Sequence, residues 1–312
     1  MNGTLLVIAG PTATGKSSVA MKIARALGTD IISCDSAQVY KYMDIGTAKP
    51  TLKERMEIRH HLVDYVMPDE EYSAVRCKED CDGIICQLFE QGKTPLIVGG
   101  TGMYLNAVLY EMNFGSAYKS DEIRSELQRL LKEKGSDYLY DILKEIDNET
   151  ALMLHKNDAK RIIRAIEIFK LSGKKKSEQI ENFTKKKRYK FYFAVLHCDR
   201  RYLYERINRR VDDMMKRGLL QEVERLASTE YKNCKSLQQA IGYKELLDYL
   251  DGKYTLGQAV EKIKQFTRNY AKRQLTWFRK VPHAVWYDIK SGEDEVAKQI
   301  LYNFNEYAKT EL

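Results

Sequence analysis

The 312-residue sequence has few prolines, no CxxC pair and no long hydrophobic run. A membrane-spanning helix needs roughly 18 consecutive apolar residues, so we expect none here. The apolar opening at residues 5–9 is too short for a signal-peptide core, and no basic residue precedes it. Six cysteines without a CxxC pair are typical of a reducing compartment. We therefore expect a cytoplasmic protein, and only five unclustered prolines argue against a stiff linker.

Three of the cysteines, Cys77, Cys81 and Cys86, are close together in the sequence. A structural metal site needs about four converging ligands, and no histidine lies near these three. We therefore expect them to act as small apolar residues of a helix, and we predict no zinc site.

The net charge of +8 is concentrated in one segment. Residues 160–190 hold twelve Lys or Arg and three Glu, a local net charge of +9. The other 281 residues therefore sum to about −1. A charge run is often only a solvated helix face, but one this asymmetric favours a polyanionic partner.

Strand and helix patterns alternate at both ends of the chain. Short apolar runs predict strands, and amphipathic stretches between them predict helices. Such alternation indicates a parallel α/β sheet flanked by helices. The predicted strands are residues 5–9, 31–34, 95–98, 191–198 and 284–289, and the first helices are 17–27, stopped by Gly28, and 73–89, capped by Ser73.

Strand patterns stop between residues 110 and 190. Helices are predicted there at 121–133, 136–144, 148–154 and 158–171. We interpret residues 115–190 as an all-helical, basic insertion. The α/β core would then consist of residues 1–114 and 191–312, with mostly helical segments at 200–280.

A phosphate-binding motif follows the first predicted strand. Residues 10–17 fit G-x-x-x-x-G-K-[ST], with a strand before them and a helix after them. Glycines allow the backbone to curl around an anion, and the amides of the helix N-terminus face its charge. Lys16 adds a cation, and the Ser17 hydroxyl is a candidate Mg²⁺ ligand. The motif residues are Gly10, Pro11, Thr12, Ala13, Thr14, Gly15, Lys16 and Ser17.

An acidic residue, Asp35, closes the second predicted strand. Ligands of open parallel sheets bind outside the carboxyl ends of the strands, so Asp35 should face the same crevice as Lys16. It can hold Mg²⁺, act as a general base or cap the next turn. The third strand ends in Thr101 rather than in an acid, which weakens the reading as an ordinary ATPase or nucleotide kinase.

These motifs, taken in order, resemble those of tRNA dimethylallyltransferases (isopentenyltransferases), and the resemblance covers about the whole chain. The shared segments are GPTATGKS at 10–17, DSAQVY at 35–40, GTAKP at 46–50, HHL at 60–62 with YSA at 72–74, GGTGMY at 99–104, ND at 157–158 with Arg161 and Arg164, GY at 242–243 and KRQLTW at 272–277. The fold implied is a P-loop NTPase-like parallel sheet with an all-helical insertion domain.

The resemblance implies a reaction. Such enzymes transfer a dimethylallyl group from dimethylallyl diphosphate to N6 of the adenosine immediately 3′ of the anticodon, in tRNAs that read codons beginning with U. The phosphate loop then holds the diphosphate of the donor, with Mg²⁺ as cofactor. Asp35 fits the base that orients and deprotonates N6, and Thr101 lies near the reacting centre. Lys16 and Arg210 would bind the leaving diphosphate. The partners expected are a tRNA anticodon stem-loop and the donor, with the protein a monomer.

The resemblance also implies a tRNA-binding surface. The family's Q-R-x-x-R motif reads here Lys160, Arg161, Ile162, Ile163 and Arg164, with lysine where glutamine is usual. In the helix near residue 270, Phe266, Tyr270 and Trp277 share a face that we interpret as core. Arg268, Lys272 and Arg279 lie on another face, open to phosphates. The remaining tRNA-binding candidates are Asp35, Ser36, Ala37, Gln38, Thr101, Arg124, Gln239, Gly242, Tyr243, Lys244 and Arg273.

Three other functions compete with the transferase. An ATP-dependent P-loop kinase of a nucleoside or small molecule predicts an acid after the third strand and needs no basic insertion. A plain RNA-binding module does not need an intact phosphate loop with Asp35. A prenyltransferase acting on free adenylate shares the donor site but does not need the basic block at residues 160–190.

Overall fold

The computed structural model describes residues 3–112, 120–181 and 186–310. They form two compact units, one of residues 1–109 with 189–312 and one of residues 110–188. We call the first the core unit and the second the helical unit. The boundary predicted at residue 114 lies outside the described residues, as does part of the basic segment, residues 182–185.

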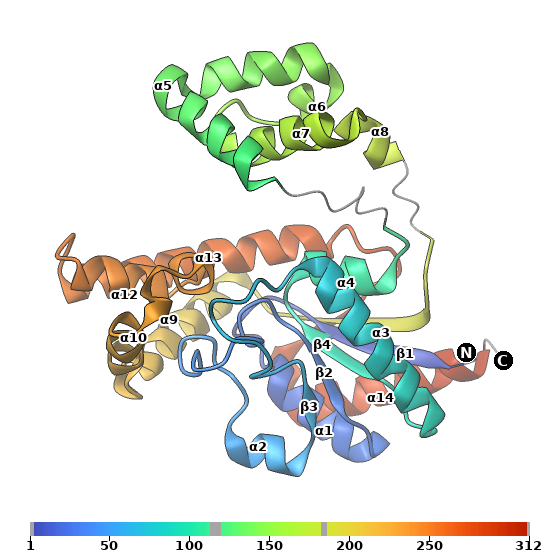
Figure 1. The fold of residues 1–312 in the computed structure, drawn as a ribbon. Coiled ribbons are helices and arrows are strands. Elements are labelled where there is room, and N and C mark those ends of the chain that lie inside the picture. Colours follow the sequence, from blue (N-terminus) through green and yellow to red (C-terminus); the bar gives the residue numbers. More distant parts are fainter. Residues whose placement is uncertain (1–2, 113–119, 182–185, 311–312) are drawn as a thin grey trace. The chain divides into compact units, whose positions relative to one another are not determined.

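The core unit contains a six-stranded, fully parallel sheet of order β3-β2-β4-β1-β5-β6 (Figure 1). Residues 5–9 are completely buried, as expected for a strand covered on both faces. The predicted α/β fold is confirmed. The two-residue strand β3 was not predicted, because two residues are too few for a periodic pattern. The strands are β1 (Thr4–Ala9), β2 (Ile31–Cys34), β3 (His60–His61), β4 (Leu96–Gly99), β5 (Lys190–His197) and β6 (Val285–Asp288).

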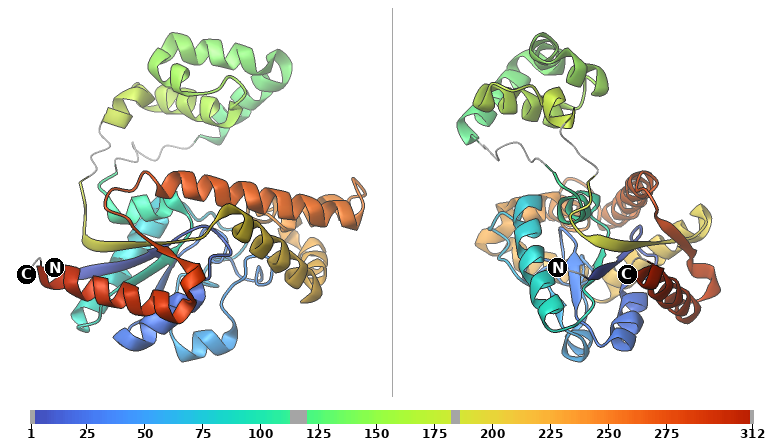
Figure 2. Two further views of the ribbon diagram at one scale, coloured as in Figure 1. Left: turned by 180° about the vertical axis from the view of Figure 1, so that it is seen from behind. Right: turned by 90° about the vertical axis from the view of Figure 1, so that its right-hand side faces the viewer.

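Helices cover both faces of this sheet (Figure 2). On one face, apolar residues of α1 and α14 pack on alternate strand residues such as Leu6 and Ile8. On the other face, Phe193 of β5 contacts Phe278 of α13 at a ring distance of 6.4 Å. The helices of the core unit are α1 (Lys16–Leu27), α2 (Leu52–Glu57), α3 (Ala74–Glu90), α4 (Gly102–Leu109), α9 (Arg200–Lys216), α10 (Leu219–Ala227), α11 (Lys235–Gln239), α12 (Tyr243–Leu250), α13 (Leu256–Phe278) and α14 (Glu293–Thr310), with 3₁₀ turns η1 (Glu230–Asn233) and η2 (Ile289–Ser291).

Local sequence signals set several helix ends. The Ser73 hydroxyl accepts a hydrogen bond from the Arg76 amide at 3.2 Å and caps α3, as predicted. Thr255 and Gln258 form a reciprocal capping box at the start of α13. Gly28 ends α1 in the left-handed conformation, with φ 59°.

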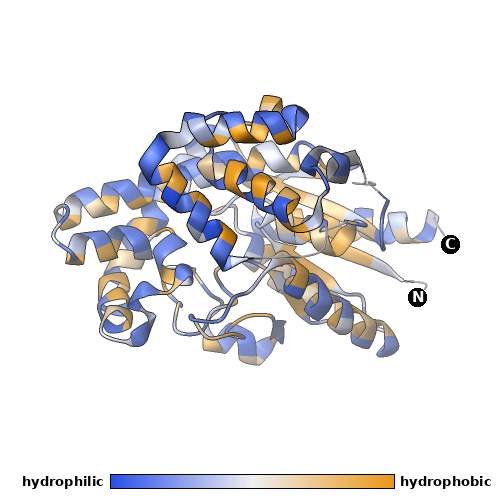
Figure 3. Cartoon of the chain, turned by 45° about the horizontal axis from the view of Figure 1, so that its top comes forward, coloured by the Kyte–Doolittle hydropathy of each residue, from blue (hydrophilic) through white to orange (hydrophobic). Residues whose placement is uncertain are grey.

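The helical unit has its own hydrophobic core, to which Leu139, Leu143, Ile162 and Ile166 contribute. Its helices are α5 (Asp121–Ile146), α6 (Asn148–Met153), α7 (Ala159–Ser172) and α8 (Lys176–Glu181). Gly135, with φ 83°, interrupts α5 between the two helices predicted there. Hydropathy colouring separates hydrophobic from hydrophilic residues around many helices (Figure 3). None of the described helices combines the length and the apolar composition needed to cross a bilayer.

Candidate active site

The phosphate loop connects β1 to α1, as the sequence predicts. Gly10 and Gly15 have φ values of 148° and 82°, a region that L side chains rarely adopt. A Cβ at Gly10 would also lie 2.5 Å from the Leu196 carbonyl oxygen. Within the loop, the Thr14 hydroxyl donates to the Pro11 carbonyl at 2.8 Å. The loop is therefore a fixed structure that requires both glycines.

Lys16 lies at the start of α1 with its ammonium turned back toward the loop. Its Nζ donates to the Pro11 carbonyl at 2.9 Å. Burial, and then the nearby charge of Arg210, lower the pKa of Lys16 to about 7, although Asp35 acts in the opposite direction. The loop therefore holds a cation that an anionic ligand would stabilise.

Arginines of α9 add to this positive charge. Arg210 has a lowered pKa because of burial, opposed by Asp35 and reinforced by Arg206 and Arg217. Arg206 donates from Nε to the Ala13 carbonyl at 2.7 Å. Sequence reasoning identified Arg210 but missed Arg206 and Arg217. Their spacing of four and seven residues from Arg210 puts all three on one side of a helix, which was the available signal.

Asp35 follows β2 and faces these cations. Its Oδ1 accepts hydrogen bonds from the amides of Ala37 at 2.9 Å and Gln38 at 3.2 Å. The turn-capping role considered from the sequence is therefore present. Because Asp35 also acts on the pKa values of Lys16 and Arg210, these three predicted residues share one site.

Thr101, at the end of β4, contacts the segment that follows Asp35. Its Oγ1 accepts from the Ser36 amide at 3.1 Å and lies 3.3 Å from the Ser36 hydroxyl. Burial, and then the nearby charge of Asp35, raise the pKa of Tyr270 of α13 to about 12. Parallel strands β2 and β4 are neighbours, which is why their carboxyl ends bring Asp35 and Thr101 together.

The structure corrects the faces predicted for α13. Tyr270 belongs to the site rather than to the core, and Phe266 is 39% exposed. Arg268 is half-buried and donates to the Asn208 side chain at 2.6 Å, so it is less accessible than the exposed Lys272 and Arg279. The helix packs along α9, and its buried residues include Ala271, Gln274 and Phe278, so its buried side differs from the one we expected.

Gln274 of α13 is a further site residue that sequence reasoning did not single out. Its Oε1 accepts from the Thr12 amide and its Nε2 donates to the Gly100 carbonyl, both at 2.9 Å. The buried side-chain amide of Gln274 therefore links the phosphate loop to the residue that follows β4. Its position inside the KRQLTW motif was the signal.

Side-chain hydrogen bonds of Gln38 and Lys49 hold the segment that follows Asp35. Gln38 donates to the carbonyls of Thr47 at 3.2 Å and Ala48 at 3.1 Å. Lys49, only 6% exposed, donates to Asp44 and Asp64 at 2.6 and 2.8 Å. The GTAKP motif is therefore explained by packing and by this lysine.

Glu222 of α10 holds the same segment from another side. Its carboxylate accepts from the backbone amides of Ile45 at 2.9 Å and Gly46 at 3.2 Å and from the Tyr243 hydroxyl at 2.6 Å. A Cβ at Gly46 would lie 2.5 Å from the Tyr243 ring, so only glycine fits there.

The predicted tRNA-binding residues differ in accessibility. Exposed side chains are those of Ser36, Lys160, Arg161, Gln239, Lys244, Lys272, Arg273 and Arg279. The prediction is wrong for the side chains of Ile162, Ile163 and Tyr243, which are buried in apolar cores. Gly242 is also buried. Arg124 and Arg164 are half-buried beside Glu167 within the helical unit.

The cysteines group differently from the sequence prediction. The thiols of Cys34, Cys77 and Cys81 lie within 4.8 Å of one another in the core. Cys86 points elsewhere and contacts Glu90 at 3.5 Å. Three ligand atoms are fewer than a structural zinc site uses, so we assign these thiols to packing.

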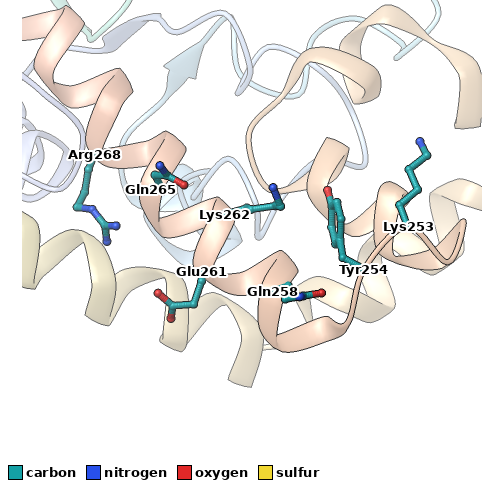
Figure 4. Close-up of a pocket in the computed structure, with 7 residues that line it drawn as sticks. All are labelled: Lys253, Tyr254, Gln258, Glu261, Lys262, Gln265 and Arg268. Atoms are coloured by element: carbon teal, nitrogen blue, oxygen red, sulfur yellow. The ribbon is translucent and has the colours of Figure 1, made fainter.

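Two hollows on the described part of the core unit differ in their lining. One is lined by Lys16, Ser17 and Asp35, together with Ser33, Gln38 and His60, and is therefore part of the site. The other, an open depression of about 510 Å³, lies over the first half of α13 (Figure 4). Its lining mixes Lys253, Lys262 and Arg268 with Glu261, and it has no phosphate loop or strand ends.

Comparisons with known proteins agree with this geometry. A family model described as IPP transferase matches residues 38–281. A tRNA dimethylallyltransferase of Clostridioides difficile is 44% identical over 299 residues, covering 95% of this chain and 96% of that protein. One of Acetivibrio thermocellus is 44% identical over 307 residues, covering 98% and 97%.

The chain is also similar to solved structures of this family. The full-length tRNA isopentenylpyrophosphate transferase of Bacillus halodurans is 39% identical, with a TM-score of 0.73 and 99% of both chains covered. A eukaryotic dimethylallyltransferase acting on tRNA is 32% identical, with a TM-score of 0.80, covering 95% of this chain and 77% of that one. Since the family model and these relatives span most of its length, the chain belongs to the IPP transferase family of enzymes.

Proposed function

We propose that this enzyme transfers a dimethylallyl group from dimethylallyl diphosphate to N6 of the adenosine immediately 3′ of the anticodon, in tRNAs that read codons beginning with U. The observation that carries the proposal is that Lys16 and Asp35 line one hollow at the carboxyl ends of the strands, while the charge of Arg210 on α9 acts on Lys16. This site combines a diphosphate cradle with a carboxylate that can take a proton.

In this proposal the phosphate loop, Lys16 and Arg210 bind the diphosphate of the donor. The bond between C1 of the dimethylallyl group and the diphosphate oxygen breaks, and a bond from C1 to N6 forms. Asp35 orients the amine and accepts its proton. The lowered pKa of Lys16 supports its role in binding the diphosphate. A bound diphosphate would stabilise the fully charged ammonium, which can then neutralise the negative charge that develops on the leaving group.

Mg²⁺ is the cofactor we propose. The residues present fit it, since the exposed Ser17 hydroxyl and the Asp35 carboxylate line one hollow and offer the hard oxygen ligands that Mg²⁺ prefers. When bound, the ion neutralises charge on the departing diphosphate. Of these two residues, we propose Ser17 as the protein ligand of Mg²⁺.

For RNA binding we propose the anticodon stem-loop as partner. The target base must leave its stack to reach Asp35, which costs a few kcal/mol. Exposed cations of the helical unit, such as Lys160 and Arg161, can offset this cost through phosphate contacts. Ser36 and Thr101, beside Asp35, are the proposed contacts near the reacting base. We further propose that residues 115–190 act as a tRNA-binding insertion in a monomer of the cytoplasm.

A kinase is not favoured. Strand β4 ends at Gly99 and is followed by Gly100 and Thr101, so the acid expected after this strand in a kinase is missing. The Thr101 hydroxyl instead pairs with the segment after Asp35.

A donor-choice assay tests the proposal. The protein, Mg²⁺ and an unmodified anticodon stem-loop are incubated with either dimethylallyl diphosphate or ATP, and the RNA is weighed by mass spectrometry. We expect a gain of one C5H8 unit with dimethylallyl diphosphate alone. No gain on several such RNAs, with ATP consumed, would support the kinase instead.

A further inference from the structure

The helical unit contains a fully buried carboxylate, that of Glu167 on α7. Its exposed fraction is 0%. Glutamate is almost never completely buried unless it is paired, because removing an isolated charge from water is strongly unfavourable. No sequence pattern singles out this residue within a helix of mixed charge.

Four N–H groups satisfy the Glu167 carboxylate. On Oε1 lie the Arg124 Nε at 2.8 Å and the Ser120 amide at 3.1 Å. On Oε2 lie the Arg124 Nη2 at 3.0 Å and the Arg164 Nη1 at 2.7 Å. Burial alone would raise the pKa of Glu167, but the hydrogen bonds from Arg164, Arg124 and Ser120 outweigh it and lower the pKa. The carboxylate is therefore charged and fixed.

The same contacts fix the two arginines. Arg124 meets the carboxylate at two points, a geometry that sets the plane of its guanidinium. The side chains of Arg124 and Arg164 remain 24% and 32% exposed, so both are partly accessible from the surface although they are anchored to a buried carboxylate. Two guanidiniums therefore share one carboxylate.

Arg161 on the same helix is held differently. Its side chain is 69% exposed and pairs with Asp158, three residues away, at 3.3 Å. Exposed pairs of this kind restrict a side chain little. The helical unit thus presents two kinds of arginine, one exposed and weakly paired at position 161, and two anchored to a buried carboxylate at 124 and 164.

We propose that Glu167 is a positioning residue that pre-orients Arg124 and Arg164 to bind RNA phosphates. The inference rests on the proposed function, in which the helical unit binds tRNA, and both arginines are among the tRNA-binding candidates of the sequence. Side chains that are already ordered lose less conformational freedom when RNA binds, which increases affinity without adding a contact.

An effect of charge alone and an effect of arginine positioning predict opposite changes in RNA affinity for Glu167→Gln. If charge alone mattered, removing a negative charge beside an RNA-binding surface would tighten binding. If Glu167 positions the arginines, the variant weakens binding by about tenfold, because a neutral amide holds two guanidiniums poorly. The sign of the change in affinity therefore decides between the two explanations.

The experiment measures the dissociation constant of an anticodon stem-loop across salt concentrations, together with single-turnover prenyl transfer at saturating RNA. For Glu167→Gln we expect weaker binding, a salt slope reduced by about one, and a transfer rate changed less than about twofold. The matched control is Glu126→Gln on α5, which removes the same charge from an exposed pair with Lys170 of α7. The control should bind RNA as well as, or more tightly than, the unchanged protein.

Arg124→Lys provides a second variant if Glu167→Gln does not fold. It keeps the positive charge and an ion pair but loses the two-point contact, so positioning predicts binding several-fold weaker at constant net charge. Equal or tighter RNA binding in a folded Glu167→Gln or Arg124→Lys protein would overturn the inference. Failure of the unchanged protein to bind RNA would overturn both this inference and the proposed function. RNA binding without prenyl transfer would overturn the proposed function alone.

Discussion

The Thr12 amide donates a hydrogen bond to the Gln274 side chain at 2.9 Å across 262 residues of sequence. The Nε2 of the same Gln274 side chain donates to the Gly100 carbonyl at 2.9 Å. Gln274 therefore fixes the distance between the phosphate loop and the end of β4, the two places where donor and acceptor must meet.

Gln274→Ala should destabilise the protein and weaken diphosphate binding. It leaves the Thr12 amide and the Gly100 carbonyl without their partner, and an unsatisfied buried polar group costs about 1–3 kcal/mol. Urea unfolding and calorimetry with inorganic diphosphate measure the two effects. Gln265→Ala, at an exposed position of the same helix, should change stability by less than about 0.5 kcal/mol. Equal effects of the two variants would contradict the role given to Gln274.

Lys16 makes diphosphate binding dependent on pH. Its pKa of about 7 means that the free protein holds this ammonium only partly charged above neutrality. An anion stabilises the charged form and raises the pKa, so binding takes up protons and weakens as the pH rises from 6 to 8.5. Calorimetry at pH 7.5 in buffers of different ionisation enthalpy measures this uptake.

Lys16→Arg is the control for proton uptake, since a guanidinium stays charged throughout this range. Protons taken up by the diphosphate itself appear with both proteins. The difference between the two proteins should be a fraction of one proton, and no difference would contradict the lowered pKa of Lys16.

Local signals predicted most of the fold and the centre of the site. The strand patterns, the glycines of the phosphate loop and the acid after β2 all depend on neighbours in the sequence, and the structure has each where it was expected. The site residues that were missed act over long distances. Gln274, Arg206 and Glu222 meet their partners only through packing of the C-terminal helices, which periodicity does not specify.

The sequence also did not show which of the predicted tRNA-binding side chains are buried. A motif shows that a residue type is required, but not whether it faces solvent. Tyr243 and Ile162 lie in motifs that resemble RNA-contacting segments, yet both are 0% exposed. Tyrosine is required at position 243 because its ring packs against Gly46 and its hydroxyl donates to Glu222.

Tyr243→Phe tests this reassignment. The variant removes the hydroxyl that donates to Glu222 at 2.6 Å, and we expect a loss of about 1.5–3 kcal/mol in the free energy of unfolding, as for hydrogen bonds to charged groups. The KM for RNA should stay within about twofold. Urea unfolding and steady-state transfer provide the measurements, with Tyr302→Phe, 69% exposed, as the control that changes neither. A raised KM at unchanged stability would restore a direct RNA contact for Tyr243.

Asp35 can be tested with two substitutions because the structure separates its two roles. Asp35→Asn keeps an oxygen that accepts from the Ala37 and Gln38 amides, whereas Asp35→Ala removes it. Both lose the base, so single-turnover transfer should fall by about 100-fold or more in each. Only the alanine variant should also disturb the turn and weaken RNA binding.

The charge change sharpens the result for Asp35→Asn. Removing a negative charge beside Lys16 and Arg210 leaves the donor site more positive, so binding of inorganic diphosphate should be equal or tighter. Asp30→Asn, which changes the same residue type just before β2 and far from the strand's carboxyl end, should keep the transfer rate. A slow Asp35→Asn enzyme with intact RNA and diphosphate binding identifies a base. If its transfer rate were preserved, Asp35 would act only through the turn, and the proton of N6 would have to leave to another group.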